Sequence, residues 1–168
     1  MNKYKTCCVI GRSSFRPSEE EVKNLDDLFE FLIVKGGVET FYFGGPGSFD
    51  SFCLKIITEK KKKYPHILAV YVANDYRDFK NPYRHTNLLD EYDEVEFFDL
   101  EFAHWKSSLY YRNKEMIKNS DYAVFYTLID EKSGSYKAFK FAKTKFKHLY
   151  GTISTTEPNI LLGCLRRN

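Results

Sequence analysis

The apolar residues of this chain gather in short, nearly continuous runs. Clear runs cover residues 6–10, 40–43, 67–72 and 121–126, and shorter ones cover 94–98 and 148–153. Strands that are apolar along their whole length are typical of a parallel sheet with both faces covered. We therefore predict that these runs are the strands of one such sheet.

Amphipathic segments separate most of the runs. Ser18 and Glu21 form a capping-box pattern before the first segment, and two glycines at 36–37 mark its end. Alternating apolar strands and amphipathic helices predict a three-layer, Rossmann-like, doubly wound α/β fold with a mostly parallel sheet in a single domain. The predicted helices begin near Ser18, Ser48, Lys106 and Ser135.

The length of 168 residues and the 43% hydrophobic content suit one globular domain. We assign residues 1–153 to this domain and residues 154–168 to a C-terminal extension. The extension is apolar enough to pack on the domain or on a second subunit of a homo-oligomer. Its apolar residues are Ile160, Leu161, Leu162 and Leu165.

Charge and cysteine content narrow the classes of partner. A net charge of +3 is too small to indicate nucleic-acid binding by itself. The four cysteines make no metal-ligand spacing with the four histidines, so we predict no metal site and expect buried, reduced thiols. No stretch is long and apolar enough for a signal peptide or a membrane span, so a cytoplasmic protein without membrane contact is expected.

Three strand-to-helix turns carry small, flexible residues. The second is the richest, because three glycines surround a proline immediately before a helix. Such a turn presents backbone N–H groups and the positive end of a helix dipole to an anion, although a tight turn that simply needs glycine is the alternative. In a doubly wound sheet these turns meet at the carboxyl edge, where ligands bind. The ligand-binding residues predicted from the turns are Gly11, Arg12, Ser13, Ser14, Gly44, Gly45, Pro46, Gly47, Ser48, Phe49, Asp50, Ser133, Gly134 and Ser135.

An arginine falls within an apolar stripe of a predicted helix. Trp105, Leu109, Arg112 and Met116 follow one another at spacings of four, three and four residues, which places them on one helix face. A guanidinium on an inward face needs a partner, either a buried acid of the protein or an anionic ligand. We include Arg112 and the adjacent Asn113 in the predicted ligand site.

Three segments in order resemble the YpsA-like family of the SLOG superfamily, Rossmann-like nucleotide-binding proteins that also include the DprA and LOG groups. They are residues 6–11 (TCCVIG), residues 41–50 (FYFGGPGSFD), and residues 112–116 (RNKEM) followed by 119–121 (NSD). The resemblance extends from about residue 6 to residue 150. It implies binding of a nucleotide or a nucleotide-derived ligand, with NAD-derived and ADP-ribose-like molecules among the candidates.

The sequence departs from this family at the expected ligand edge. The family's first loop typically reads Gly-His-Arg, whereas here it is Gly11-Arg12-Ser13, and the usual glycine pair of the last turn is Ser133-Gly134. These changes indicate a shift in ligand identity. The dinucleotide fingerprint G-x-G-x-x-G is absent, which argues against an NAD-dependent dehydrogenase.

The sequence favours a binding protein over an enzyme. Related nucleoside deoxyribosyltransferases carry a catalytic glutamate at the position of Ala138, and alanine is neither a nucleophile nor a general acid. Our main hypothesis is therefore non-catalytic nucleotide binding by a sensor, regulator or sequestering protein. The alternative is an N-glycosidase or phosphoribohydrolase-like enzyme that uses Asp50. A third hypothesis, single-stranded DNA binding in the manner of DprA, is disfavoured by the modest charge.

Overall fold

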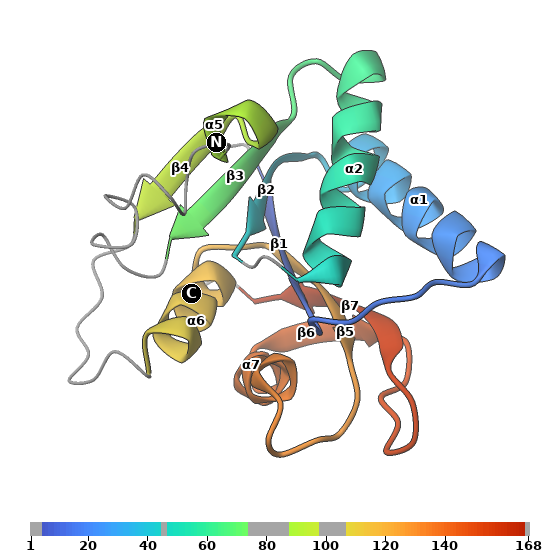
Figure 1. Cartoon of the computed structure of the whole chain (residues 1–168), viewed down its shortest axis with the longest axis vertical. Coiled ribbons are helices and arrows are strands. Elements are labelled where there is room, and N and C mark those ends of the chain that lie inside the picture. Colours follow the sequence, from blue (N-terminus) through green and yellow to red (C-terminus); the bar gives the residue numbers. More distant parts are fainter. Residues whose placement is uncertain (1–4, 45–46, 74–87, 98–106, 167–168) are drawn as a thin grey trace.

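The structure is a computed structural model that describes residues 5–44, 47–73, 88–97 and 107–166. Within these residues the chain forms one seven-stranded sheet with helices on both faces (Figure 1). The strands are β1 Lys5–Gly11, β2 Val38–Phe43, β3 Leu68–Ala73, β4 Glu94–Phe97, β5 Tyr122–Thr127, β6 Phe146–Tyr150 and β7 Asn159–Leu165. The helices are α1 Glu19–Val34, α2 Ser48–Lys63, α5 Leu88–Glu91, α6 Ser108–Lys118 and α7 Gly134–Lys143.

The sheet is mostly parallel, as predicted. Its strand order is β4-β3-β2-β1-β5-β7-β6, and the first five of these strands pair in parallel. The exception is β7, which pairs antiparallel with both β5 and β6. The chain runs outward from β1 through β2 to β3 and β4, and it returns to the other side of β1 with β5. This reversal of direction is the feature that defines a doubly wound fold.

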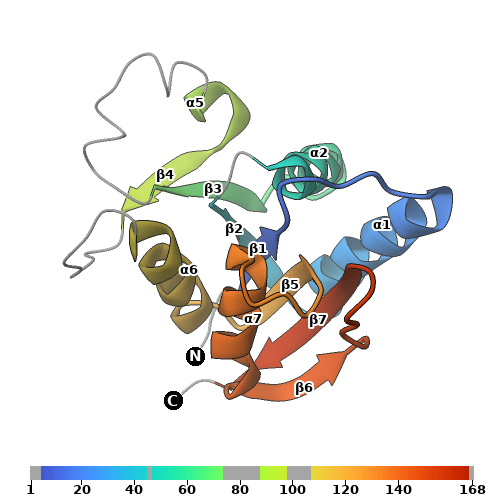
Figure 2. The same ribbon diagram turned by 60° about the horizontal axis from the view of Figure 1, so that its bottom comes forward.

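Two apolar cores lie on the two faces of the sheet. Along β1, Cys7 and Val9 face the core beneath α1 and α2, whereas Cys8 and Ile10 face the core beneath α6 and α7. Figures 1 and 2 show these helix pairs on opposite faces. Because strand side chains alternate between faces, a strand in such a position must be apolar throughout, which explains the runs seen in the sequence. The three-layer, Rossmann-like prediction is confirmed.

Helix starts follow the predicted signals. Ser18 and Glu21 form a complete capping box at α1: the Glu21 amide donates to Ser18 Oγ at 3.2 Å, and the Ser18 amide donates to Glu21 Oε1 at 3.1 Å. The helices α2 and α7 begin at or next to the predicted Ser48 and Ser135. The predicted start at Lys106 lies outside the described residues, and α6 begins at Ser108.

The C-terminal segment differs from the predicted extension. Residues 159–165 form β7, which lies inside the sheet between β5 and β6. Leu161 and Leu165 join the core beneath α6 and α7, while Leu162 joins the core beneath α1 and α2. The apolar residues that suggested docking therefore belong to a strand covered on both faces, and the sheet continues across the boundary that we expected after residue 153.

Two smaller expectations also differ. The strand predicted over 148–153 is β6, which ends at Tyr150, because Gly151 turns the chain with a φ of +102°. Leu109 is 54% exposed, so its predicted place on the inward face of the helix is wrong, whereas Arg112 and Met116 on that stripe are buried. Trp105 lies outside the described residues.

The structure also bears on the cysteines, on metal ligands and on membrane spans. Cys7, Cys8 and Cys53 are buried free thiols, and Cys164 is half-buried. Among the described residues, no group of histidine, cysteine and acidic side chains is arranged to hold a metal ion. Of the helices in the described ranges, none has the length and apolar composition of a membrane span.

Candidate functional site

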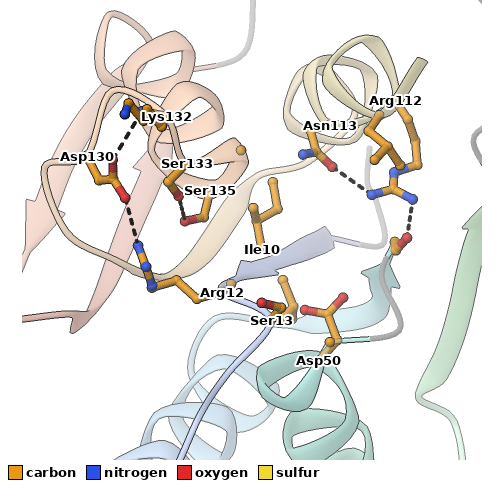
Figure 3. A pocket seen from close by; sticks show the side chains of 16 residues that line it. Ile10, Arg12, Ser13, Asp50, Arg112, Asn113, Asp130, Lys132, Ser133 and Ser135 are labelled. Atoms are coloured by element: carbon orange, nitrogen blue, oxygen red, sulfur yellow. Dashed lines mark hydrogen bonds and ion pairs between the residues drawn. The ribbon is translucent and has the colours of Figure 1, made fainter. Parts of the chain in front are cut away.

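The carboxyl ends of β1, β2 and β5 surround the point where the sheet reverses direction. Open α/β sheets bind ligands at such switch points, since the loops leaving neighbouring strands diverge there. A cleft of about 400 Å³ opens at this point (Figure 3). Its walls come from the turns after the three strands and from the N-terminal parts of α2, α6 and α7.

The cleft brings together most of the residues that the sequence assigned to a ligand site. Those lining it are Gly11, Arg12, Ser13, Gly44, Gly47, Asp50, Arg112, Asn113, Ser133, Gly134 and Ser135. Gly45 and Pro46 lie outside the described residues. Ser14, Ser48 and Phe49 are not among the lining residues.

Phe49 and Ser48 hold the first turn against α2 instead of lining the cleft. Phe49 is buried, stacks on Tyr126 with ring centroids 5.2 Å apart, and lies under Gly11. A Cβ at Gly11 would come within 2.2 Å of the Phe49 ring, so only glycine fits there. The Ser48 amide and hydroxyl both donate to the carbonyl of Ser13, at 2.9 and 2.8 Å. The Ser48 amide, a predicted phosphate donor, is therefore already engaged within the protein.

Arg112 is the most deeply buried cation of the cleft, at 6% exposure. Its Nη1 donates to the carbonyl of Gly44, and its Nη2 donates to Asn113 Oδ1 at 3.2 Å (Figure 3). Its Nε is buried and has no hydrogen-bond partner among the described residues. Both of these partners are neutral oxygens, and such a buried guanidinium retains capacity for an anion.

The charge of Arg112 is balanced by its surroundings only in part. Burial lowers the pKa of Arg112, and the nearby Tyr71, Asp50 and Tyr92 oppose that shift. An arginine remains protonated in proteins even so, because its intrinsic pKa is very high. The cleft therefore holds a permanent cation in a poorly solvated position.

Asp50 supplies a carboxylate from the first turn of α2, at 5% exposure. The dipole of α2 favours a negative charge at this position. Burial raises the pKa of the Cys8 thiol to about 12, and Asp50 adds to that shift. The Cys53 thiol is shifted in the same direction for the same two reasons. Both thiols stay protonated at neutral pH and are poor nucleophiles.

A second cationic group lies across the cleft. Arg12 Nη1 and Asp130 Oδ2 form an ion pair at 3.7 Å, beyond hydrogen-bond distance. Asp130 also accepts a hydrogen bond from the Lys132 amide at 3.1 Å. The loop after β1 is thus connected electrostatically to the turn that precedes α7.

Hydroxyl groups organise the start of α7. Ser133 caps the helix by accepting from the Tyr136 amide at 3.3 Å, and its hydroxyl lies 2.7 Å from that of Ser135. The Ser135 hydroxyl in turn lies 2.8 Å from that of Thr127. A Cβ at Gly134 would meet no atom within 4 Å, so there is open space beside this turn.

Sequence reasoning missed several lining residues, namely Val9, Ile10, Leu109, Asp130 and Lys132. Asp130 and Lys132 had a readable signal, because they lie in the same strand-to-helix turn as Ser133. Val9 and Ile10 had none, since residues at the end of a buried strand look like any other core residues. No family model matches the sequence, and no curated protein matches it.

Proposed function

We propose that this protein binds a nucleotide or nucleotide-derived ligand in the cleft and acts without catalysis, as a sensor, regulator or sequestering protein. The observation that carries the proposal is Arg112, a buried cation with an unpartnered Nε at the edge of the sheet where ligands bind. An anionic group in the cleft would complete its hydrogen bonding. The resemblance of the sequence to the YpsA-like family supports the same ligand class.

The other lining groups suit the remaining parts of a nucleotide. Gly134 keeps a side chain away from one wall of the cleft, which allows close approach of a ligand, whereas Gly44 makes room for the Arg112 guanidinium. Asp50 would repel a phosphate placed beside it, but its carboxylate is a suitable acceptor for ribose hydroxyls. Leu109 and Ile10 provide apolar surface for a base.

Several features argue against N-glycosidase chemistry. Ala138, at the position of the related catalytic glutamate, is fully buried in the core beneath α7. Asp50 and Asp130 are the only carboxylates among the lining residues that the structure describes. Asp130 is paired with Arg12, and Asp50 interacts electrostatically with Arg112. Partial compensation of the charges of these arginines is a role for both carboxylates that needs no reaction.

The binding test compares the wild-type protein with Arg112→Gln by calorimetry against nucleoside phosphates, NAD and ADP-ribose. Loss of a charge-assisted hydrogen bond should weaken affinity by about 1.5–3 kcal/mol. Lys118→Gln is the matched control, because Lys118 is on the same helix but pairs with Glu115 outside the cleft. Absence of binding by the wild-type protein to every compound in the panel would refute the proposal.

The catalytic question needs a separate assay. Chromatography after long incubation of the same compounds with concentrated protein should show no released base. The Asp50→Asn variant should bind with mildly altered affinity, because no bond is broken at this residue. Turnover that disappears in Asp50→Asn would instead establish the N-glycosidase alternative.

A further inference from the structure

Two buried side-chain nitrogens of the described residues lack any hydrogen-bond partner, and both belong to arginines of this cleft. They are Arg12 Nη1 and Arg112 Nε. Buried polar groups are nearly always satisfied, so each exception needs an explanation. Two exceptions of the same chemical type in one cleft indicate one common cause, a ligand that satisfies both.

The two arginines lie on opposite sides of the cleft. Arg12 follows β1 and extends toward the turn before α7, whereas Arg112 projects from α6 over the end of β2 (Figure 3). Ile10 lies between them in the same view. Each guanidinium also has its own protein contact, Asp130 for Arg12 and the Gly44 carbonyl for Arg112. The two guanidinium groups are thus held by contacts on different walls of the cleft.

The contact of Arg12 is the less complete of the two. Asp130 faces it at 3.7 Å as an ion pair, and the same carboxylate is already engaged by the Lys132 amide. The Arg12 side chain as a whole is 31% exposed, although its Nη1 is buried. An anion with better geometry would form the bidentate hydrogen bonds for which a guanidinium is shaped.

We propose that the ligand carries two separated anionic groups, one bound by Arg112 and the other by Arg12, and that Asp130 holds the second position until the ligand binds. This inference rests on the proposed nucleotide function. It narrows the ligand class to nucleotides with phosphates at two distant positions, such as nucleoside 3′,5′-bisphosphates. A mononucleotide engages one arginine only.

The test measures affinities for adenosine 5′-monophosphate, adenosine diphosphate and adenosine 3′,5′-bisphosphate. We expect the bisphosphate to bind at least roughly tenfold more tightly than the monophosphate, because it gains a charge-assisted contact. Adenosine diphosphate, whose phosphates are adjacent, should gain less. In Arg12→Gln the advantage of the bisphosphate should disappear while monophosphate affinity is retained. Arg112→Gln should weaken all three compounds.

Two further variants control the assignment. Arg166→Gln makes the same change at an exposed arginine outside the cleft and should alter none of the affinities. Asp130→Asn removes the competing carboxylate and should raise bisphosphate affinity several-fold. This variant keeps the idea testable if Arg12→Gln folds poorly, which melting without ligand would reveal. A fall in bisphosphate affinity in Asp130→Asn would overturn its role as a competitor.

Failure of this inference is distinguishable from failure of the proposed function. Equal affinity for the monophosphate and the bisphosphate, or a bisphosphate advantage that persists in Arg12→Gln, would refute the second anion site and leave nucleotide binding intact. If adenosine diphosphate gained as much affinity over the monophosphate as the bisphosphate does, the proposed separation of the two anionic groups would be refuted. No binding of any of the three compounds would refute both ideas.

Discussion

At the scale of single residues, glycines of the cleft serve different physical purposes. A Cβ at Gly44 would lie 2.6 Å from Arg112 Cζ, so this glycine lets the guanidinium rest on the backbone at the end of β2. A Cβ at Gly134 would meet nothing within 4 Å. The first glycine is therefore required by the protein itself, whereas no steric contact of the protein requires the second. This difference makes the two glycines a matched pair for mutation.

Gly44→Ala should damage both the fold and the site. The new methyl group has to displace Arg112 or shift β2, which should lower the free energy of unfolding by about 1–3 kcal/mol. Displacement of the guanidinium should also weaken nucleotide affinity. Urea denaturation and calorimetry would measure the two effects. An unchanged urea midpoint would show that Arg112 is free to move, contrary to its close contacts.

Gly134→Ala should separate stability from binding. Alanine at the first position of α7 meets no steric obstacle, so the free energy of unfolding should stay constant or rise by up to about 1 kcal/mol. Nucleotide affinity should fall, because the methyl group occupies space that the ligand uses. The same urea and calorimetry measurements apply. Unaltered affinity in a stable variant would mean that the ligand does not approach this turn.

At the scale of elements, the position of α2 depends on its contacts with α1. Glu30 of α1 accepts hydrogen bonds from Tyr64 Oη and from Lys60 Nζ, the latter at 3.0 Å. Lys60 also pairs with Asp26 at 3.2 Å. The hydrogen bond from Tyr64, followed by that from Lys60, holds the pKa of Glu30 below its usual value. This link fixes the helix whose first turn carries Asp50 into the cleft.

Glu30→Gln should therefore reduce the acid sensitivity of the fold. A carboxylate with a lowered folded-state pKa contributes stability above its unfolded pKa of about 4.3, and this contribution is lost as pH falls through the lower folded value. Urea midpoints measured from pH 7 down to pH 3 should fall less steeply in the variant. Glu20→Gln removes a carboxylate from α1 without this link and serves as the control. Parallel curves for wild type and Glu30→Gln would contradict the assignment.

The elements and the turns of the cleft could be predicted because their signals are local. A capping pair such as Ser18 and Glu21, or a glycine after an apolar run, acts within a few residues of its own position. Long-range pairings have no such signal. The ion pair between Arg12 and Asp130 and the insertion of β7 beside β5 both join distant parts of the chain. Residue spacing alone also wrongly predicted that Leu109 faces the core. A residue in the first turn of a helix can face a cleft instead.

At the scale of the whole molecule, β7 joins β6 to the rest of the sheet. It pairs with β5 on one edge and with β6 on the other. Its side chains enter both apolar cores, through Leu161 on one face and Leu162 on the other. The strand β5 leads directly into the turn that carries Asp130 and Ser133. The cleft is consequently supported by a segment that lies far from it in the sequence.

Removal of residues 154–168 should therefore unfold the protein. Without β7, β6 loses its only strand partner among the described residues, β5 becomes an exposed edge, and both cores lose leucine side chains. Circular dichroism and size-exclusion chromatography of the shortened chain should show loss of cooperative melting and aggregation. A synthetic peptide of residues 154–168, added to the shortened chain, should restore cooperative melting if the loss of β7 is what unfolds it. A shortened chain that melts cooperatively and binds nucleotide would instead show that residues 1–153 are a self-sufficient domain, with β7 dispensable to both sheet and cleft.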